Sequence, residues 1–141
     1  MVIAIFTLLL LATPFGSADV EICPGGPAFG FVSGSDRFDA RTEEALDGYL
    51  ENLDRPLWRP GWITVFPTVA GPADGPAHAL AERRKITIAK RLSNRGLKTD
   101  RVRFEGLRSA SPDEVDTNVY YSTLSTPRTT WKALVTPGIM C

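Results

Sequence analysis

The feature that most constrains the fold is an amphipathic stretch, residues 76–95, whose apolar stripe is interrupted by an arginine. Arg84 lies within that stripe. If the stretch is one helix, at about 100° per residue, the same face carries Ala77, Leu80, Ala81, Ile88 and Leu92. Gly96 follows at the C′ position, where glycine commonly ends a helix. From periodicity alone, the simpler interpretation is that the Arg84 stem packs on the stripe while its guanidinium reaches solvent or a nearby carboxylate.

The rest of the chain predicts one more helix and several strands. A helix capped by Asp39 should present an apolar stripe of Ala45, Leu46, Tyr49, Leu50 and Leu53. The polar residues 113–127 are expected to form a loop. Strands are predicted for the apolar, β-branched or alternating segments 28–32, 62–69, 101–107 and 129–135. The order β-α-β-α-β-β predicts an α+β fold, a two-layer sandwich with two helices on one mixed sheet.

The first 18 residues have the pattern of a secretory signal peptide. Their apolar run of about ten residues is too short to span a bilayer, and Gly16 and Ala18 are spaced for signal peptidase. We therefore expect cleavage after Ala18, a periplasmic location, and a single domain over residues 19–141 that does not insert stably into a membrane. Because no Lys or Arg precedes the apolar run, an uncleaved anchor is the alternative.

The chain has only two cysteines, one near each end of that predicted domain. In an oxidising compartment, Cys23 and Cys141 predict one disulfide closing nearly the whole domain, worth on the order of 4 kcal/mol in the chain-entropy model. Two unrelated thiols are the alternative, because spacing alone does not bring two Cα atoms within bonding range.

Charge and residue types argue against several functions. Lys and Arg together number 16, as do Asp and Glu, so no field of one sign is available to hold nucleic acid or an anionic membrane surface. Two cysteines and the single His78 make a poor metal-ligand set. No nucleophile motif accompanies His78, and the acidic residues between 36 and 44 suit the first turns of a helix. We expect no metal, no cofactor and no enzymatic activity.

The order of elements and the spacing of several residues resemble the OmpA-like domain, the peptidoglycan-binding module of outer-membrane proteins, flagellar stator proteins and peptidoglycan-associated lipoproteins. The resemblance covers about residues 27–136, and "FGFVSGSDRF" is similar to the family's first strand and the serine-bearing turn after it. Without a gap from Phe66 to Pro112, the family pattern is matched by Thr68, Leu80, Arg84, Leu92, Gly96, Asp100, Gly106 and Pro112.

The resemblance implies a ligand site. In the family, the arginine at the position of Arg84 pairs with a carboxylate of diaminopimelate in the peptidoglycan stem peptide, a fork-to-carboxylate match that lysine makes poorly. Thr68 is implied beside that ligand. The family's aspartate, which receives the ligand's ammonium, is Val69 here, and Asp74 in the next loop is the candidate to replace it. Other family positions also differ, with Ala77 for an asparagine and Phe66 and Arg108 for glycines.

Two functions follow from this resemblance. The first is non-covalent, weakened association with peptidoglycan through Arg84, Thr68 and Asp74, in a periplasmic envelope protein. The second is an OmpA-like fold that has lost its peptidoglycan site and serves as a structural or protein-interaction module of the envelope. Val69 and Ala77 favour the second function, and Arg84 on the apolar stripe favours the first.

Overall fold

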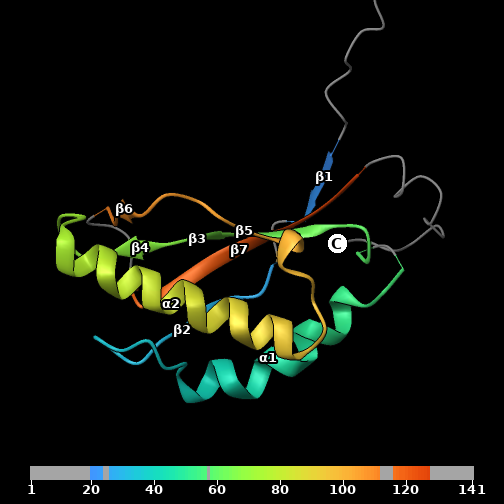
Figure 1. The fold of residues 1–141 in the computed structure, drawn as a ribbon, viewed down its shortest axis with the longest axis horizontal. Helices are drawn as coiled ribbons and strands as arrows, with labels where there is room; N and C mark the ends of the chain where they lie inside the picture. Colours follow the sequence, from blue (N-terminus) through green and yellow to red (C-terminus); the bar gives the residue numbers. More distant parts are fainter. Residues whose placement is uncertain (1–19, 24–25, 57, 112–115, 128–141) are drawn as a thin grey trace, which may run out of the picture.

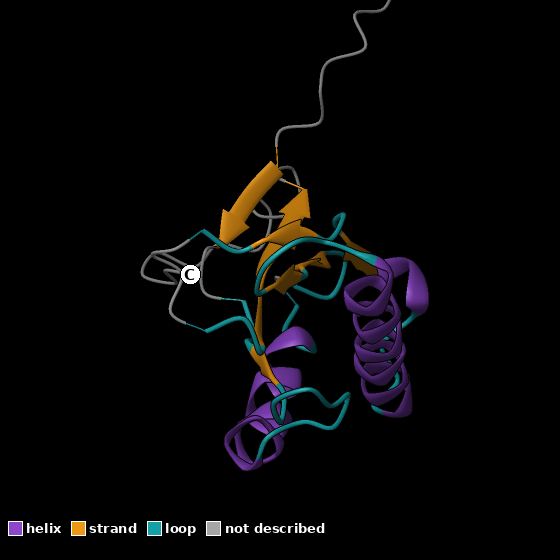
Figure 2. Cartoon of the chain, turned by 90° about the vertical axis from the view of Figure 1, so that its left-hand side faces the viewer, coloured by secondary structure: helices purple, strands orange, loops and turns teal. Residues whose placement is uncertain are grey.

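The computed structural model describes residues 20–23, 26–56, 58–111 and 116–127. Two helices lie on the same side of a mixed sheet, which confirms the predicted α+β class (Figures 1 and 2). The elements in chain order are β1 (Val20–Cys23), β2 (Phe29–Gly30), α1 (Ala40–Leu53), β3 (Trp62–Phe66), β4 (Thr68–Val69), α2 (Gly75–Asn94), the 3-10 turn η1 (Thr99–Arg101), β5 (Val102–Phe104), β6 (Arg108–Ser109) and β7 (Val119–Pro127).

Strand β7 organises the main sheet. It pairs antiparallel with β3 along its middle, with β1 at its carboxyl end and with β2 at its amino end, while β5 pairs parallel with the other edge of β3. The strand order is β1-β7-β3-β5. Gly61 comes so close to β7 that a built Cβ would collide with the backbone carbonyl of Ser125. The close approach makes this position require glycine.

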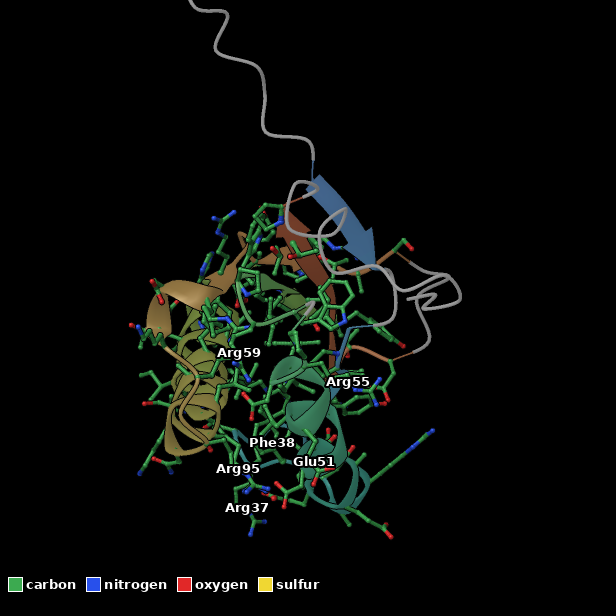
Figure 3. All side chains as sticks on the ribbon, turned by 90° about the vertical axis from the view of Figure 1, so that its right-hand side faces the viewer. Arg37, Phe38, Glu51, Arg55, Arg59 and Arg95 are labelled. Atoms are coloured by element: carbon green, nitrogen blue, oxygen red, sulfur yellow. The ribbon has the colours of Figure 1, made fainter. Side chains whose placement is uncertain are left out.

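A single hydrophobic core fills the space between the sheet and the helices. Alternate residues of β3 and β7 point into it, as period-2 strands with one covered face do. Phe38 lies between the two helices (Figure 3). The buried cluster comprises Phe29, Phe31, Phe38, Leu46, Leu50, Leu53, Trp58, Ile63, Val65, Ile88, Leu92, Leu97, Tyr120 and Leu124.

Helix α1 begins as predicted. The Asp39 carboxylate accepts the backbone N–H of Thr42 at 2.7 Å, the geometry of an N-cap. Its buried stripe is narrower than expected, because Ala45 and Tyr49 lie on the solvent side while Leu46, Leu50 and Leu53 are buried.

Helix α2 follows the predicted limits closely. Asp74 is its N-cap, and Gly96 follows its end with φ +85°, the left-handed conformation that suits glycine at C′. Ala81, Arg84, Ile88 and Leu92 are its buried residues. The carboxylate of Asp47 on α1 accepts hydrogen bonds from Arg95, which joins the end of α2 to α1.

The strand predicted for 62–69 and the loop predicted for 113–127 were both wrong in detail. The segment 62–69 is two strands rather than one, because Pro67 cannot donate to the ladder and β4 instead pairs parallel with β6 in a separate two-stranded sheet. Residues 119–127 form β7 instead of a loop. Strand β1 was also not predicted. The predicted strand 129–135, the signal peptide 1–18 and Cys141 lie outside the described residues.

Candidate functional site

Arg84 is buried in the third turn of α2, with only 2% of its surface exposed. Its Nε donates to the backbone carbonyl of Ser35 at 2.8 Å, and Nη2 donates to Oδ1 of Asn118 at 3.1 Å. The guanidinium also lies over two aromatic rings, 4.7 Å from the centroid of Phe31 and 5.5 Å from that of Tyr120. These contacts hold the guanidinium from two chain segments, 31–35 and 118–120, so its position is set before any ligand arrives.

A cavity of about 340 Å³ lies beside this guanidinium and is lined by residues of β4 and of the first turns of α2. In Figure 1, β4 and the start of α2 lie at the left-hand end of the molecule. Apolar groups of β4 and the first turns of α2 form part of its wall, and hydroxyl and amide groups from loops and β4 form another part. The lining residues are Ser33, Thr68, Val69, Ala70, Pro76, Ala77, Leu80, Arg84, Thr117, Asn118 and Tyr120.

The charge of Arg84 is not neutralised by any described residue. Its neighbours on α2 are paired, Arg83 with Asp36 at 3.9 Å and Lys85 with Glu82 at 2.7 Å, whereas the two hydrogen-bond acceptors of Arg84 are both neutral. Nη1 of Arg84 donates no hydrogen bond within the described part of the chain. A buried cation that lacks a counter-ion is costly, and an incoming anion would remove that cost.

The structure brings Arg84 and Thr68 together at the cavity and keeps Asp74 apart from it. Thr68, the first residue of β4, is buried and lines the wall. The Asp74 carboxylate instead accepts the N–H of Ala77 at 3.1 Å as the helix cap, and Asp74 is not among the lining residues. Val69 and Ala77, which stand where the family has Asp and Asn, both line the cavity.

The sequence did not predict the four residues that contact the Arg84 guanidinium. Asn118 and Tyr120 lie in the segment that was predicted to be a loop, and Ser35 contributes a backbone carbonyl, which any residue type could supply. Phe31 was expected only as a strand residue. The serine-bearing turn after the first strand was the one available signal, because it places this loop next to α2.

Other candidate groups do not gather into a site. His78 is exposed on the outside of α2. Over the residues that the structure describes, no three His, Cys, Asp or Glu side chains come together in a way that could hold a metal ion. No helix in the same ranges is long and apolar enough to cross a membrane.

Comparison with solved structures identifies the fold. The C-terminal domain of Helicobacter pylori MotB matches with a TM-score of 0.54 at 17% sequence identity, over 75% of this chain and 89% of that domain. The chain therefore has the fold of an OmpA-like domain, as the sequence predicted. At this level of identity, the likeness concerns the fold alone.

Two further structures are similar to this chain. The OmpA-like domain of FopA1 from Francisella tularensis has a TM-score of 0.48 at 11% identity and covers 71% of each chain. An outer membrane protein from Borrelia burgdorferi has a TM-score of 0.49 at 15% identity, over 78% of this chain and 97% of that one. No protein-family model and no curated protein sequence matches the chain.

Proposed function

We propose that this domain associates non-covalently with peptidoglycan by binding a carboxylate of the stem peptide at Arg84. The observation that carries the proposal is a buried guanidinium beside a cavity, held by two neutral acceptors and lacking a carboxylate partner in the described ranges. The resemblance noted in the sequence assigns the arginine at this position to the diaminopimelate carboxylate. The proposed role is binding and not catalysis.

The chemistry of the cavity suits a carboxylate. Nη1 and the second N–H of Nη2 remain to donate to an anion, and the contacts to Phe31 and Tyr120 keep the guanidinium plane fixed. Thr68 can add a hydroxyl from the wall. The ammonium of diaminopimelate would meet Val69 where the family has an aspartate, and losing a desolvated charge partner typically costs several kcal/mol. We therefore propose that binding of this zwitterion is weakened.

The location follows from the same proposal. We propose that residues 1–18 are a signal peptide that is removed, that residues 19–141 form the periplasmic domain, and that Cys23 and Cys141 pair as a disulfide in that oxidising compartment. Cell-wall association then requires no membrane-spanning segment in the mature chain.

Co-sedimentation of the purified protein with peptidoglycan sacculi tests the proposal. Arg84→Ala should abolish retention, whereas Arg83→Ala removes the same charge from the neighbouring exposed position and should leave retention unchanged. Circular dichroism of both variants controls for folding. If the wild type is not retained, the proposal fails, and the second candidate, an envelope protein-interaction module that has lost the wall site, is favoured by Val69 and Ala77. Retention that survives Arg84→Ala also contradicts the proposal.

A further inference from the structure

We propose that the Arg84 cavity selects a carboxylate whose neighbouring nitrogen is acylated and uncharged, over one that carries a free ammonium. This specificity rests on the function proposed above, since it names the chemical form of the ligand at the same site. It assigns Val69 and Ala77 as the residues that determine the selection.

The first evidence for this selection is the chemistry of the cavity wall. Val69, Ala77 and Leu80 present aliphatic groups, and Pro76 adds a ring that cannot donate a backbone hydrogen bond. Among the described lining residues, the polar side chains apart from Arg84 include those of Ser33, Thr68, Thr117 and Asn118, and all four are neutral. Three acidic residues lie near these lining residues in sequence, and none of the three lines the cavity itself: Asp74 caps α2, Glu82 pairs with Lys85, and the Asp116 carboxylate accepts the backbone N–H of Asn118.

The second evidence is the charge balance between the cavity and its ligand. A bound carboxylate neutralises the positive charge of Arg84, so the described lining residues and the ligand together have no net charge. A free ammonium on the same carbon would bring the total back to +1 and would place that charge against Val69, which can neither accept a hydrogen bond nor balance it. An amide nitrogen needs only a neutral acceptor.

Neutral acceptors for an amide N–H are present. Thr68 lines the cavity and its side chain carries a hydroxyl, and Oδ1 of Asn118 has a second lone pair beyond the one that accepts from Nη2 of Arg84. The aliphatic wall meanwhile suits the methyl or methylene groups that flank such a carboxylate. The cavity is therefore complementary to an N-acyl amino acid.

Two parts of a cell-wall peptide have this chemistry. One is the carboxyl-terminal residue of the peptide, whose nitrogen lies in the preceding peptide bond. The other is a diaminopimelate residue whose amine has been acylated in a cross-link.

A matched pair of soluble probes tests the selection. The first is a stem peptide in which the carboxylate beside the free side-chain amine of diaminopimelate is the one free carboxylate, all other carboxyl groups being amidated, and the second is the same peptide with that amine acetylated. Titration calorimetry on the full-length protein should give at least tenfold tighter binding of the acetylated peptide. A third probe, a stem peptide in which a carboxyl-terminal D-alanine carries the one free carboxylate and the others are amidated, distinguishes the two sources: binding as tight as that of the acetylated peptide points to chain ends, and weaker binding points to cross-links. Both results with the D-alanine probe support the proposal only if the acetylated peptide also binds more tightly than the free-amine peptide.

Substitutions at Val69 test whether this residue of the cavity wall determines the preference. Val69→Asp should reverse the preference, because the new carboxylate can pair with the free ammonium. Val69→Thr has nearly the same shape and stays neutral, so it should keep the wild-type preference. Equal or tighter binding of the free-amine peptide by the wild type overturns the inference, and that comparison needs no variant to fold.

Failure of this inference is distinct from failure of the proposed function. If sacculi are retained through Arg84 while the free-amine peptide binds more tightly, the wall-binding function holds and the selection is wrong. If no probe binds and sacculi are not retained, both are overturned.

Discussion

Nη2 of Arg84 donates to Oδ1 of Asn118 across 3.1 Å, which links the middle of α2 to the residue directly before β7. The backbone N–H of Asn118 in turn donates to the Asp116 carboxylate at 2.9 Å. Asn118 is therefore held from its own turn while it positions the guanidinium. Because its side chain is a neutral amide, it orients Arg84 without cancelling the charge that an anionic ligand requires.

The substitution Asn118→Asp should separate the orienting effect of residue 118 on Arg84 from the effect of the Arg84 charge on ligand binding. The substitution keeps the shape of the acceptor but turns the contact into an ion pair, so the anionic ligand would meet a neutralised arginine and a nearby negative charge. We expect retention on sacculi to fall at least tenfold, with the unfolding midpoint in urea equal to or above that of the wild type. Undiminished retention would show that the charge of Arg84 is not what the ligand recognises.

The close contact between Gly61 and β7 predicts a large loss of stability. A Cβ at this position would overlap the carbonyl oxygen of Ser125, so Gly61→Ala must displace the backbone of β7 and should cost about 2–3 kcal/mol. Gly48→Ala is the matched control, because Gly48 lies in the interior of α1 with no heavy atom near its missing Cβ. It should stabilise the protein by about 0.5–1 kcal/mol. Urea denaturation of both variants measures the difference, and equal effects would contradict the packing described.

Substitutions at Asp74 should change the stability of the domain and leave its retention on sacculi unchanged. Asp74→Ala removes the oxygen that accepts the Ala77 N–H and should cost about 1 kcal/mol, whereas Asp74→Asn keeps a capping oxygen and should cost much less. Because Asp74 is outside the cavity lining, both variants should be retained on sacculi as well as the wild type is. Loss of retention in Asp74→Asn would instead give this carboxylate the ligand role that the sequence suggested.

The two cysteines give a prediction about the covalent state. Protein exported to an oxidising compartment should contain no free thiol and should show a mass 2 Da below that of the reduced chain, as one disulfide requires. Replacing both cysteines with serine should lower the unfolding free energy by on the order of 4 kcal/mol, if the closed loop acts through chain entropy. Two titratable thiols in the exported protein would rule out the disulfide.

Sequence periodicity predicted the helices and β3 because their buried faces are aliphatic. Leu46, Leu50, Ile63 and Val65 repeat at the spacing of a helix or a strand, so the pattern is visible without the structure. Strand β7 has a covered face of another kind, since Tyr120, Ser122, Leu124 and Thr126 alternate inward and three of the four carry a hydroxyl group. Such a strand looks polar in sequence, although it is central in the sheet.

The candidate site was predictable only in part, for a similar reason. Arg84 and Thr68 could be placed because a family pattern fixes their spacing, and both line the cavity. Asn118 and the Ser35 carbonyl reach Arg84 from 34 and 49 residues away along the chain. Contacts over such separations depend on the path of β7 and of the loop after β2, which no local pattern encodes.

The central position of β7 also decides when the domain can assemble during synthesis. Residues 20–23 pair with residues 124–127, and β2 and β3 also pair with β7. These early strands therefore have their main hydrogen-bonding partner only after β7 has been made. Before that point, the parallel contact between β3 and β5 is the main-sheet pairing that the emerging chain can form. Assembly of the main sheet therefore waits until β7 has been made, and its dominance by distant contacts makes this step slow relative to helix formation.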